Sequence, residues 1–160
     1  TSPVAVQGGL AFASLAVGGL STCGLTPAGA AYCWGRNGEN ELGDGTTTQR
    51  SVPTAVAGGL VFASLMSGNE HSCGLTSAGA AYCWGENIDG PLGDGTTAPT
   101  ASNAPTAVLG GLVFTNLSTG GNHTCGLISG GVPYCWGDNG TAEIGDGTTT
   151  NRTTPTAVKP

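Results

Sequence analysis

The sequence predicts an all-β protein made of three repeats, each with four short antiparallel strands. Glycine occurs 30 times among the 160 residues and only 9% of the residues are charged, which suits short strands and tight turns and does not suit long exposed helices. Trp34, Trp84 and Trp136 follow one another at separations of 50 and 52 residues, and a pair of cysteines precedes each of them. Landmarks that return at such a period are typical of a protein built from repeated units.

The first strand of each repeat is predicted at a short segment led by proline, which suits a strand start or an edge strand. The segment at residues 3–6 returns from Pro53, Pro105 and Pro155. We therefore divide a single repeat domain, residues 1–160, into repeats of approximately 3–52, 53–104 and 105–154, with 155–160 starting a fourth copy of the first strand. The two extra residues of the middle repeat fall in the polar stretch 98–102, a loop where insertion costs little.

A longer apolar run predicts the second strand, at residues 10–17, 60–67 and 112–119. Phe62 and Leu65 lie three positions apart, hence on opposite faces of a strand, which indicates burial on both faces, as in a sheet packed between two other sheets. A helix is the alternative for this run. We prefer a strand because the run is only eight residues long and has a glycine at each end.

The third and fourth strands are predicted as a hairpin around a three-residue loop that ends in Gly29, Gly79 or Gly131. The last residue of such a loop often takes the left-handed conformation, which glycine adopts at the least cost. The hairpin register places Tyr32 beside Gly24, where a large ring can cover bare backbone.

The same register places the two cysteines of each repeat opposite each other. Pairing Thr26 with Ala30 aligns Cys23 with Cys33, and opposed residues of an antiparallel pair have Cα atoms about 4.5–5.5 Å apart, within reach of a disulfide. Buried free thiols and a metal site are the alternatives, but nine residues separate the two cysteines and no closely spaced zinc-type pair occurs. The sequence thus predicts three disulfides: Cys23–Cys33, Cys73–Cys83 and Cys125–Cys135.

A polar loop follows each tryptophan, at residues 35–47, 85–97 and 137–149, and each loop has one apolar anchor and an Asp-Gly turn. The first and third loops carry carboxylates of the kind that bind calcium: Glu39, Glu41 and Asp44, and Asp138, Glu143 and Asp146. Their spacing is not that of a calcium loop, so we expect neither a metal ion nor a cofactor.

Four strands in about 50 residues are typical of one blade of a β-propeller. The chain also resembles a known family, through the pattern H-[ST]-C-G-L-x3-G-x2-Y-C-W-G-x-N, then L-G-D-G-T-T, then P-x-x-V. This pattern resembles the repeat of the RCC1 family (regulator of chromosome condensation) in its bacterial, extracellular, cysteine-containing form. It covers essentially the whole chain. The departures are Ser21, where the later repeats have His71 and His123, and residues 40–43, 90–93 and 142–145, where the family usually has G-Q-L-G.

Three blades leave the fold open, since closed propellers have about four to eight blades. Each end of the stack would expose strands and apolar surface that need a neighbour. The chain is then a piece of a longer propeller, half of a ring closed by two copies, or one unit of a head-to-tail filament. Because residues 3–6 and 155–158 are copies of one strand, the unit begins and ends at the same phase of the repeat. We expect it to bind copies of itself.

Charge and composition exclude several function classes. The net charge is −6 and Lys159 is the single lysine, so no basic patch for a nucleic acid is present. No run of eighteen apolar residues predicts a membrane span. The chain starts with Thr1 in mid-repeat, as a processed product or a segment of something larger would. Paired cysteines with almost no lysine favour an extracellular, secreted or cell-surface setting.

Catalysis is not expected, because the only histidines, His71 and His123, recur at one repeat position and suit a structural hydrogen-bonding role. We predict a non-enzymatic extracellular structural or interaction module that assembles with itself. The alternative is a propeller that binds a protein or a carbohydrate through its loops. The resemblance implies two known roles, exchange factors for a small GTPase and a β-lactamase inhibitor; the acidic charge argues against the first. For carbohydrate binding, the three tryptophans are the candidate stacking rings, although core packing between blades suits them better.

Four asparagines fit the N-glycosylation pattern, all in the last repeat: Asn116, Asn122, Asn139 and Asn151. Threonine-rich stretches at residues 46–48, 96–100 and 148–156 are compatible with O-glycosylation. Such short motifs are often unused, so a glycan is a minor hypothesis.

Overall fold

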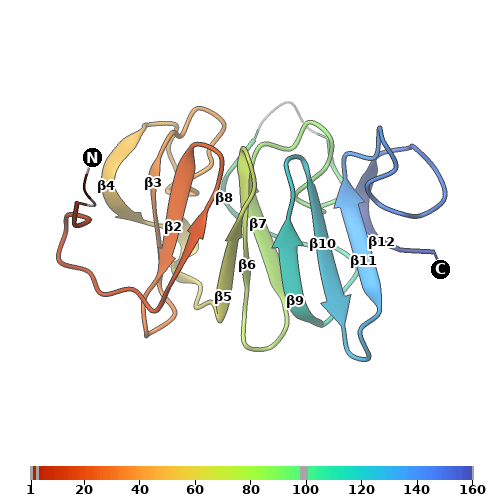
Figure 1. Cartoon of the computed structure of the whole chain (residues 1–160), viewed down its shortest axis with the longest axis horizontal. Coiled ribbons are helices and arrows are strands. Elements are labelled where there is room, and N and C mark those ends of the chain that lie inside the picture. The colour runs from red at the N-terminus through yellow and green to blue at the C-terminus, as the bar shows by residue number, and fades with distance from the viewer. Residues whose placement is uncertain (1, 3, 98–100, 160) are drawn as a thin grey trace.

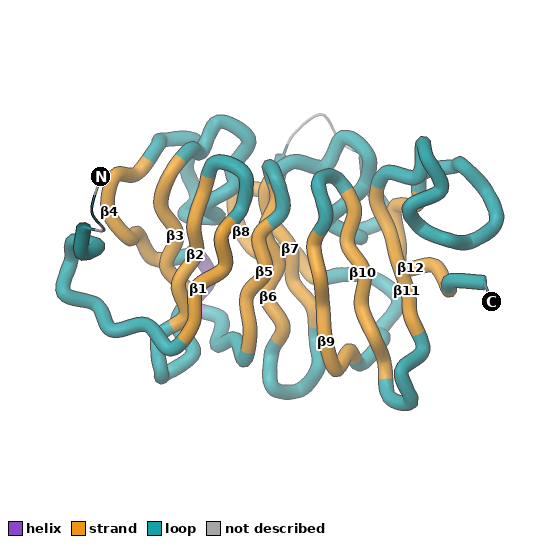
Figure 2. The backbone as a smooth tube through the Cα atoms, in the orientation of Figure 1, coloured by secondary structure: helices purple, strands orange, loops and turns teal. Residues whose placement is uncertain are grey.

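The computed structural model describes residues 2, 4–97 and 101–159, and within them the chain is all-β, as the sequence predicts. The strands form three four-stranded antiparallel sheets, which we call the first, second and third blades. The blades lie side by side in a row, with the amino terminus at one end and the carboxyl terminus at the other (Figure 1). The stack is therefore open, and tight turns and longer loops join the strands (Figure 2).

The strand bounds are similar in the three blades. The first blade consists of β1 (Ser14–Val17), β2 (Ser21–Leu25), β3 (Ala31–Gly35) and β4 (Arg50–Ala55). The second follows the short 3-10 helix η1 (Ala57–Gly59) and consists of β5 (Ser64–Ser67), β6 (His71–Leu75), β7 (Ala81–Gly85) and β8 (Ser102–Ala107). The third consists of β9 (Phe114–Thr119), β10 (His123–Ile128), β11 (Pro133–Gly137) and β12 (Arg152–Ala157).

Each blade ends with the proline-led strand that the sequence repeat places first. In the first blade, Thr54 and Ala55 of β4 pair with Cys33 and Tyr32 of β3, so the strand closes the sheet of the hairpin before it. The copy at residues 4–6 forms no strand, and Pro3 lies outside the described residues. The expectation of a strand there is wrong for residues 4–6, which pair with no sheet edge among the described residues.

The second predicted strand is shorter than expected and starts after its phenylalanine. Phe62 precedes β5, and both Phe62 and Leu65 pack in the core toward the first blade. Met66, the next residue, packs in the core toward the third blade. Burial on both faces of the sheet is as expected, but the assignment of Phe62 and Leu65 to opposite faces is wrong, because the chain is not yet extended in the sheet at Phe62.

Two apolar cores lie between neighbouring blades. The buried residues between the first and second blades are Cys23, Leu25, Ala31, Cys33, Leu42, Phe62 and Trp84. Those between the second and third blades are Cys73, Leu75, Ala81, Cys83, Leu92, Phe114, Leu117 and Trp136. Each core is thus completed only when a second blade covers the first.

A phenylalanine ring covers the glycine in the middle of each hairpin. A Cβ atom on Gly74 would lie 2.5 Å from the ring of Phe62, and one on Gly24 would lie 2.6 Å from the ring of Phe12. Tyr82 is opposite Gly74 in the strand register, as expected. The expectation that the tyrosine covers the glycine is nevertheless wrong, because the segment before β5 folds the Phe62 ring over that space.

The hairpin register is the one deduced from the loop length, with Cys23 opposite Cys33 and Tyr32 opposite Gly24. Disulfides join Cys23 to Cys33, Cys73 to Cys83, and Cys125 to Cys135, each with Cα atoms 4.1 Å apart. The first two bridges are fully buried, whereas Cys125 at the carboxyl-terminal end of the stack is partly exposed. Each disulfide therefore links the two central strands of one blade.

Candidate functional site

The contact between neighbouring blades is built twice with equivalent atoms. In the first interface, the main-chain carbonyl of Glu41 accepts hydrogen bonds from Trp84 Nε1 at 3.0 Å and from Ser72 Oγ at 3.3 Å. The carbonyl lies in the loop after β3, and both donors lie in the second blade. All three residues are buried, so the pairing satisfies polar groups that water cannot reach.

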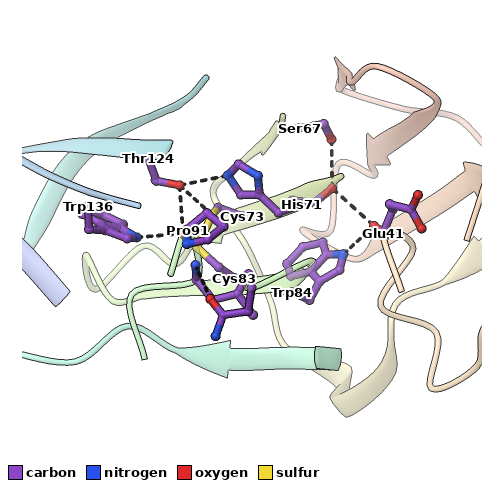
Figure 3. Close-up of a disulfide and its surroundings, with 12 residues drawn as sticks. Glu41, Ser67, His71, Cys73, Cys83, Trp84, Pro91, Thr124 and Trp136 are labelled. Carbon is purple, nitrogen blue, oxygen red and sulfur yellow. Dashed lines mark hydrogen bonds between the residues drawn. A yellow bond between two sulfur atoms is a disulfide. The ribbon is translucent and has the colours of Figure 1, made fainter. Parts of the chain in front are cut away.

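The second interface repeats this arrangement one blade further along the chain. The carbonyl of Pro91 accepts from Trp136 Nε1 at 2.8 Å and from Thr124 Oγ1 at 3.0 Å. Figure 3 shows both interfaces on either side of the Cys73–Cys83 disulfide. Since Glu41 and Pro91 have different side chains, this hydrogen bonding depends on the main chain at that position.

Main-chain hydrogen bonds extend each interface beyond the tryptophan. The turn of one hairpin accepts from the residue that begins the next blade, from Phe62 N to Gly29 O and from Phe114 N to Gly79 O, both at 2.9 Å. On the polar-loop side, Gly45 N donates to Asn103 O at 2.8 Å and Gly95 N to Thr153 O at 2.9 Å. A further bond joins Gly19 N to Gly68 O in the first interface and Asn69 N to Gly121 O in the second, so each interface is fixed at several separate points.

His71 connects the second and third blades by a side-chain contact. Its Nε2 lies 3.0 Å from Thr124 Oγ1, and it donates there because the single hydroxyl proton is used on the Pro91 carbonyl. Burial, with a smaller contribution from His123, lowers the pKa of His71 to about 4, so the ring is neutral at pH 7. A neutral buried imidazole in a structural contact agrees with the role expected from the sequence.

A buried asparagine holds the polar loop that carries the accepting carbonyl. Asn37 Nδ2 donates to the carbonyls of Thr46 at 2.8 Å and Thr48 at 3.1 Å, and Asn37 Oδ1 accepts from Leu42 N at 3.0 Å. Asn139 makes the same three bonds in the third blade, and in the second blade Asn87 donates to the Thr96 carbonyl and accepts from Leu92 N. Sequence reasoning assigned these residues no structural role, although their recurrence two positions after each Trp-Gly pair was a signal that could have found them.

The carboxylates considered for calcium are used within the protein. Asp44 pairs with Arg50 at 2.7 Å and accepts from Thr46, and these hydrogen bonds outweigh partial burial and hold the pKa of Asp44 below its usual value. The side chain of Glu41 is buried, with its Oε1 3.5 Å from Arg36 Nε. The described residues contain no group of three or more His, Cys, Asp or Glu side chains arranged to hold a metal ion.

The four candidate glycosylation sites differ in exposure. Asn116, Asn122 and Asn151 are exposed. Asn139 is fully buried, and its Nδ2 donates to the carbonyls of Thr148 and Thr150, both at 3.0 Å. The folded chain therefore does not offer the nitrogen of Asn139 for modification.

The two ends of the stack each expose half of an interface. Trp84 and Trp136 are fully buried, but Trp34 is only partly buried, and its Nε1 has no acceptor among the residues that the structure describes. At the opposite end, the Glu143 carbonyl corresponds to those of Glu41 and Pro91 and accepts from no donor within the described part of the chain. The stack therefore has a donor end and an acceptor end.

The fold and the interfaces define a protein of open β-propeller blades, and comparison with known proteins identifies the family. The model of the regulator of chromosome condensation (RCC1) repeat matches residues 28–75 and 78–127, and a second model of that repeat matches residues 12–41 and 63–90. The chain belongs to the RCC1 repeat family, whose members are typically binding or regulatory modules.

Similar proteins share the repeat or the fold. The chain is 30% identical over 164 aligned residues to the probable E3 ubiquitin-protein ligase HERC4 of Rattus norvegicus, covering 99% of this chain and 16% of that protein. Prp20p of Saccharomyces cerevisiae, studied for its binding to Gsp1p and histones and also solved with Kap60, superposes with a TM-score of 0.85 at 21% identity, over 93% of this chain. The ectodomain of the Physcomitrella patens receptor kinase CR4 superposes with a TM-score of 0.54 at 27% identity, over 81% of this chain.

The chain spans only part of each of these proteins: 16% of HERC4, 38% of the Prp20p chain and 28% of the CR4 ectodomain. Each of these proteins is therefore longer than the three blades described here. No helix within residues 2, 4–97 and 101–159 is long and apolar enough to cross a membrane.

Proposed function

We propose that the chain is a non-enzymatic extracellular structural and interaction module that assembles with copies of itself through its open blade ends, as a closed ring or a head-to-tail filament. One observation carries the proposal: residues that are buried between blades inside the stack have exposed counterparts at its ends. Leu75 and Leu117 are 6% and 4% exposed, whereas their counterparts Leu127 and Leu15 are 40% and 57% exposed. Covering such apolar surface favours association.

The absence of catalysis in this proposal is supported by how the reactive side chains are used. His71 is neutral and engaged with Thr124, the cysteines are all in disulfides among the described residues, and Asp44 and Asp146 pair with arginines. None of these groups is left poised as a nucleophile or a general base. We also propose no cofactor and no nucleic-acid partner.

The disulfides support the extracellular or cell-surface part of this proposal. Three disulfides in a single chain of this size are typical of an oxidising compartment. The likeness to a receptor-kinase ectodomain agrees with this location. Alkylation of the chain taken directly from its native source, without reductant, tests it: six blocked cysteines support the location and six reactive thiols contradict it.

Light scattering at micromolar concentration tests the self-assembly. We expect the wild-type chain to form particles of two or more copies. Leu15→Glu places a charge on the donor end and should yield single chains, whereas Ile88→Glu, on an exposed loop of the middle blade, should assemble like the wild type. A wild-type chain that remains a single copy would contradict the proposal.

Binding of another protein or a glycan through the loops is the second candidate. The binding of Gsp1p and histones by Prp20p supports the protein branch. The full burial of Trp84 and Trp136 weighs against the glycan branch, since a ring that stacks on a sugar must expose a face. A monomeric chain that captures a protein partner, with binding abolished by loop substitutions such as Ile88→Glu, would favour this candidate.

A further inference from the structure

We propose that the joint between two copies is a third blade–blade interface, in which the first blade of one copy docks on the third blade of another in the register of the two internal interfaces. This inference rests on the proposed self-assembly and adds the surfaces, the register and the partner, a second copy of this chain. Continuity with an interface that the chain already builds twice is the argument for it.

The acceptor end supplies the first apolar half of a third core. Each internal core takes three apolar side chains from the earlier of its two blades: a leucine at the end of β2 or β6, the apolar residue of the polar loop, and a valine after β4 or β8. The counterparts in the third blade are Leu127, which is 40% exposed, Val158, which is partly buried, and Ile144, which is already fully buried within the chain. A mainly apolar hollow of about 230 Å³ lies on this blade, lined by Asn116, Ser118, Cys125, Gly126, Leu127 and Pro133.

The donor end supplies the second apolar half. In the internal cores, the following blade contributes a phenylalanine, a leucine of its first strand and its tryptophan. The counterparts in the first blade are Phe12, Leu15 and Trp34, and Phe12 already packs against Trp34 with ring centroids 5.7 Å apart. The same pairing of rings occurs between Phe62 and Trp84 at 6.0 Å, inside the first core. The two rings of the donor end are thus already paired as they are in an internal core.

The polar groups at the two ends complement each other atom by atom. In the internal register, Trp34 Nε1 and Thr22 Oγ1 of one copy would both donate to the Glu143 carbonyl of the other, as Trp136 and Thr124 do to Pro91. His123 would donate to Thr22, as His71 does to Thr124. The joint therefore leaves none of these groups buried without a partner, and this joint has the histidine contact that Ser21 removes from the contact between the first and second blades.

The main chain gives the register a residue pair that can be tested. The bridge between Ala30 and Val61 connects the first hairpin to the start of the second blade. Its counterparts at the two ends are Val132, 45% exposed, and Ala11, also exposed. Antiparallel partners have Cα atoms about 4.5–5.5 Å apart, so cysteines at these two positions would lie within disulfide reach across the joint.

Cross-linking with the double variant Ala11→Cys/Val132→Cys tests the register, because the native cysteines are already paired in the described chain. Under oxidation and non-reducing electrophoresis we expect nearly complete intermolecular linkage, as a discrete dimer for a two-copy ring or as a ladder for a filament. The control is Ile88→Cys/Val132→Cys, since the loop of Ile88 lies at the opposite end of the strands from the hairpin turns. Its linkage should be at least tenfold lower.

The outcomes separate this inference from the proposed function. Particles of several copies by light scattering, with no more linkage in the Ala11/Val132 variant than in the control, would overturn the register and leave self-assembly standing. Single chains without linkage would overturn both. Trp34→Phe gives an independent measurement: removal of the indole N–H should lower the association constant about tenfold, because the Glu143 carbonyl loses one donor. An unchanged association constant would contradict the predicted joint.

Discussion

The indole Nε1 of Trp84 donates a 3.0 Å hydrogen bond to the main-chain carbonyl of Glu41 in the neighbouring blade. The ring belongs to the hairpin of one blade, and the carbonyl belongs to the loop that leaves the previous one. Apolar packing and hydrogen bonding are therefore combined in one side chain, and Trp84 and Trp136 each contact the blade before their own.

Trp84→Phe should destabilise the chain more than Trp34→Phe does. The first change removes a buried hydrogen bond inside the stack and should lower the free energy of unfolding by at least about 1 kcal/mol. Trp34 Nε1 has no acceptor within the described chain, so its change should cost less than about 0.5 kcal/mol in the single chain. Urea denaturation under conditions that keep the chains apart measures both. Equal losses would show that the indole hydrogen bond contributes nothing to the interface.

Asn37→Ala should unfold the first polar loop. The change removes the partners of Leu42 N and of the Thr46 and Thr48 carbonyls, and it should cost about 2–3 kcal/mol because these groups are partly or fully buried. Asn37→Asp is the matched control, because it keeps an acceptor for Leu42 N and removes the donors to the Thr46 and Thr48 carbonyls. Its loss in free energy of unfolding should therefore differ from that of the alanine variant. Thermal unfolding by circular dichroism gives the comparison, and an unchanged midpoint for the alanine variant would show that Asn37 does not hold the polar loop.

The three disulfides should differ in their rates of reduction. Thiol exchange requires access to a sulfur atom, and the bridge between Cys125 and Cys135 is the one with a partly exposed cysteine, whereas Cys73 and Cys83 are fully buried. Mild reductant should therefore open the third-blade bridge first. Differential alkylation with peptide mass spectrometry identifies the order. If the Cys73–Cys83 bridge opened first, access in the folded chain would not control reduction.

Stability should fall as the pH is lowered from about 6.5 to about 4, because of His71. Its pKa is about 4 in the folded chain and 6.5 in its ordinary range, so the unfolded chain binds more protons in this interval. The total loss should be about 3 kcal/mol and should level off below pH 4 for this group. His71→Ser, which copies Ser21 of the first blade, should flatten the dependence. Denaturation between pH 7 and pH 4.5 measures this slope above the range in which Asp44 and Asp146 contribute.

Local spacing predicted the hairpins correctly, whereas two longer-range relations were missed. The loop length determined that Cys23 lies opposite Cys33, because strand pairing next to a tight turn leaves one register. The period of the repeat did not reveal its phase, since a cyclic pattern looks the same wherever it is divided; the strand at Arg50–Ala55 therefore joined the preceding sheet. The role of Asn37 depends on bonds to residues 9 and 11 positions away, which no strand or turn pattern describes.

The stack of blades has a direction, because the tryptophan donates from the later blade to the earlier one in both interfaces. The second blade gives donors to the blade before it and a carbonyl to the blade after it. Two donor ends have no acceptor to exchange, so head-to-head contacts between copies lack this pairing. A copy damaged at a single end would still dock by the other and would then stop further growth. Trace amounts of such a copy would act as a chain terminator in a filament, and the two ends of a filament would be chemically distinct.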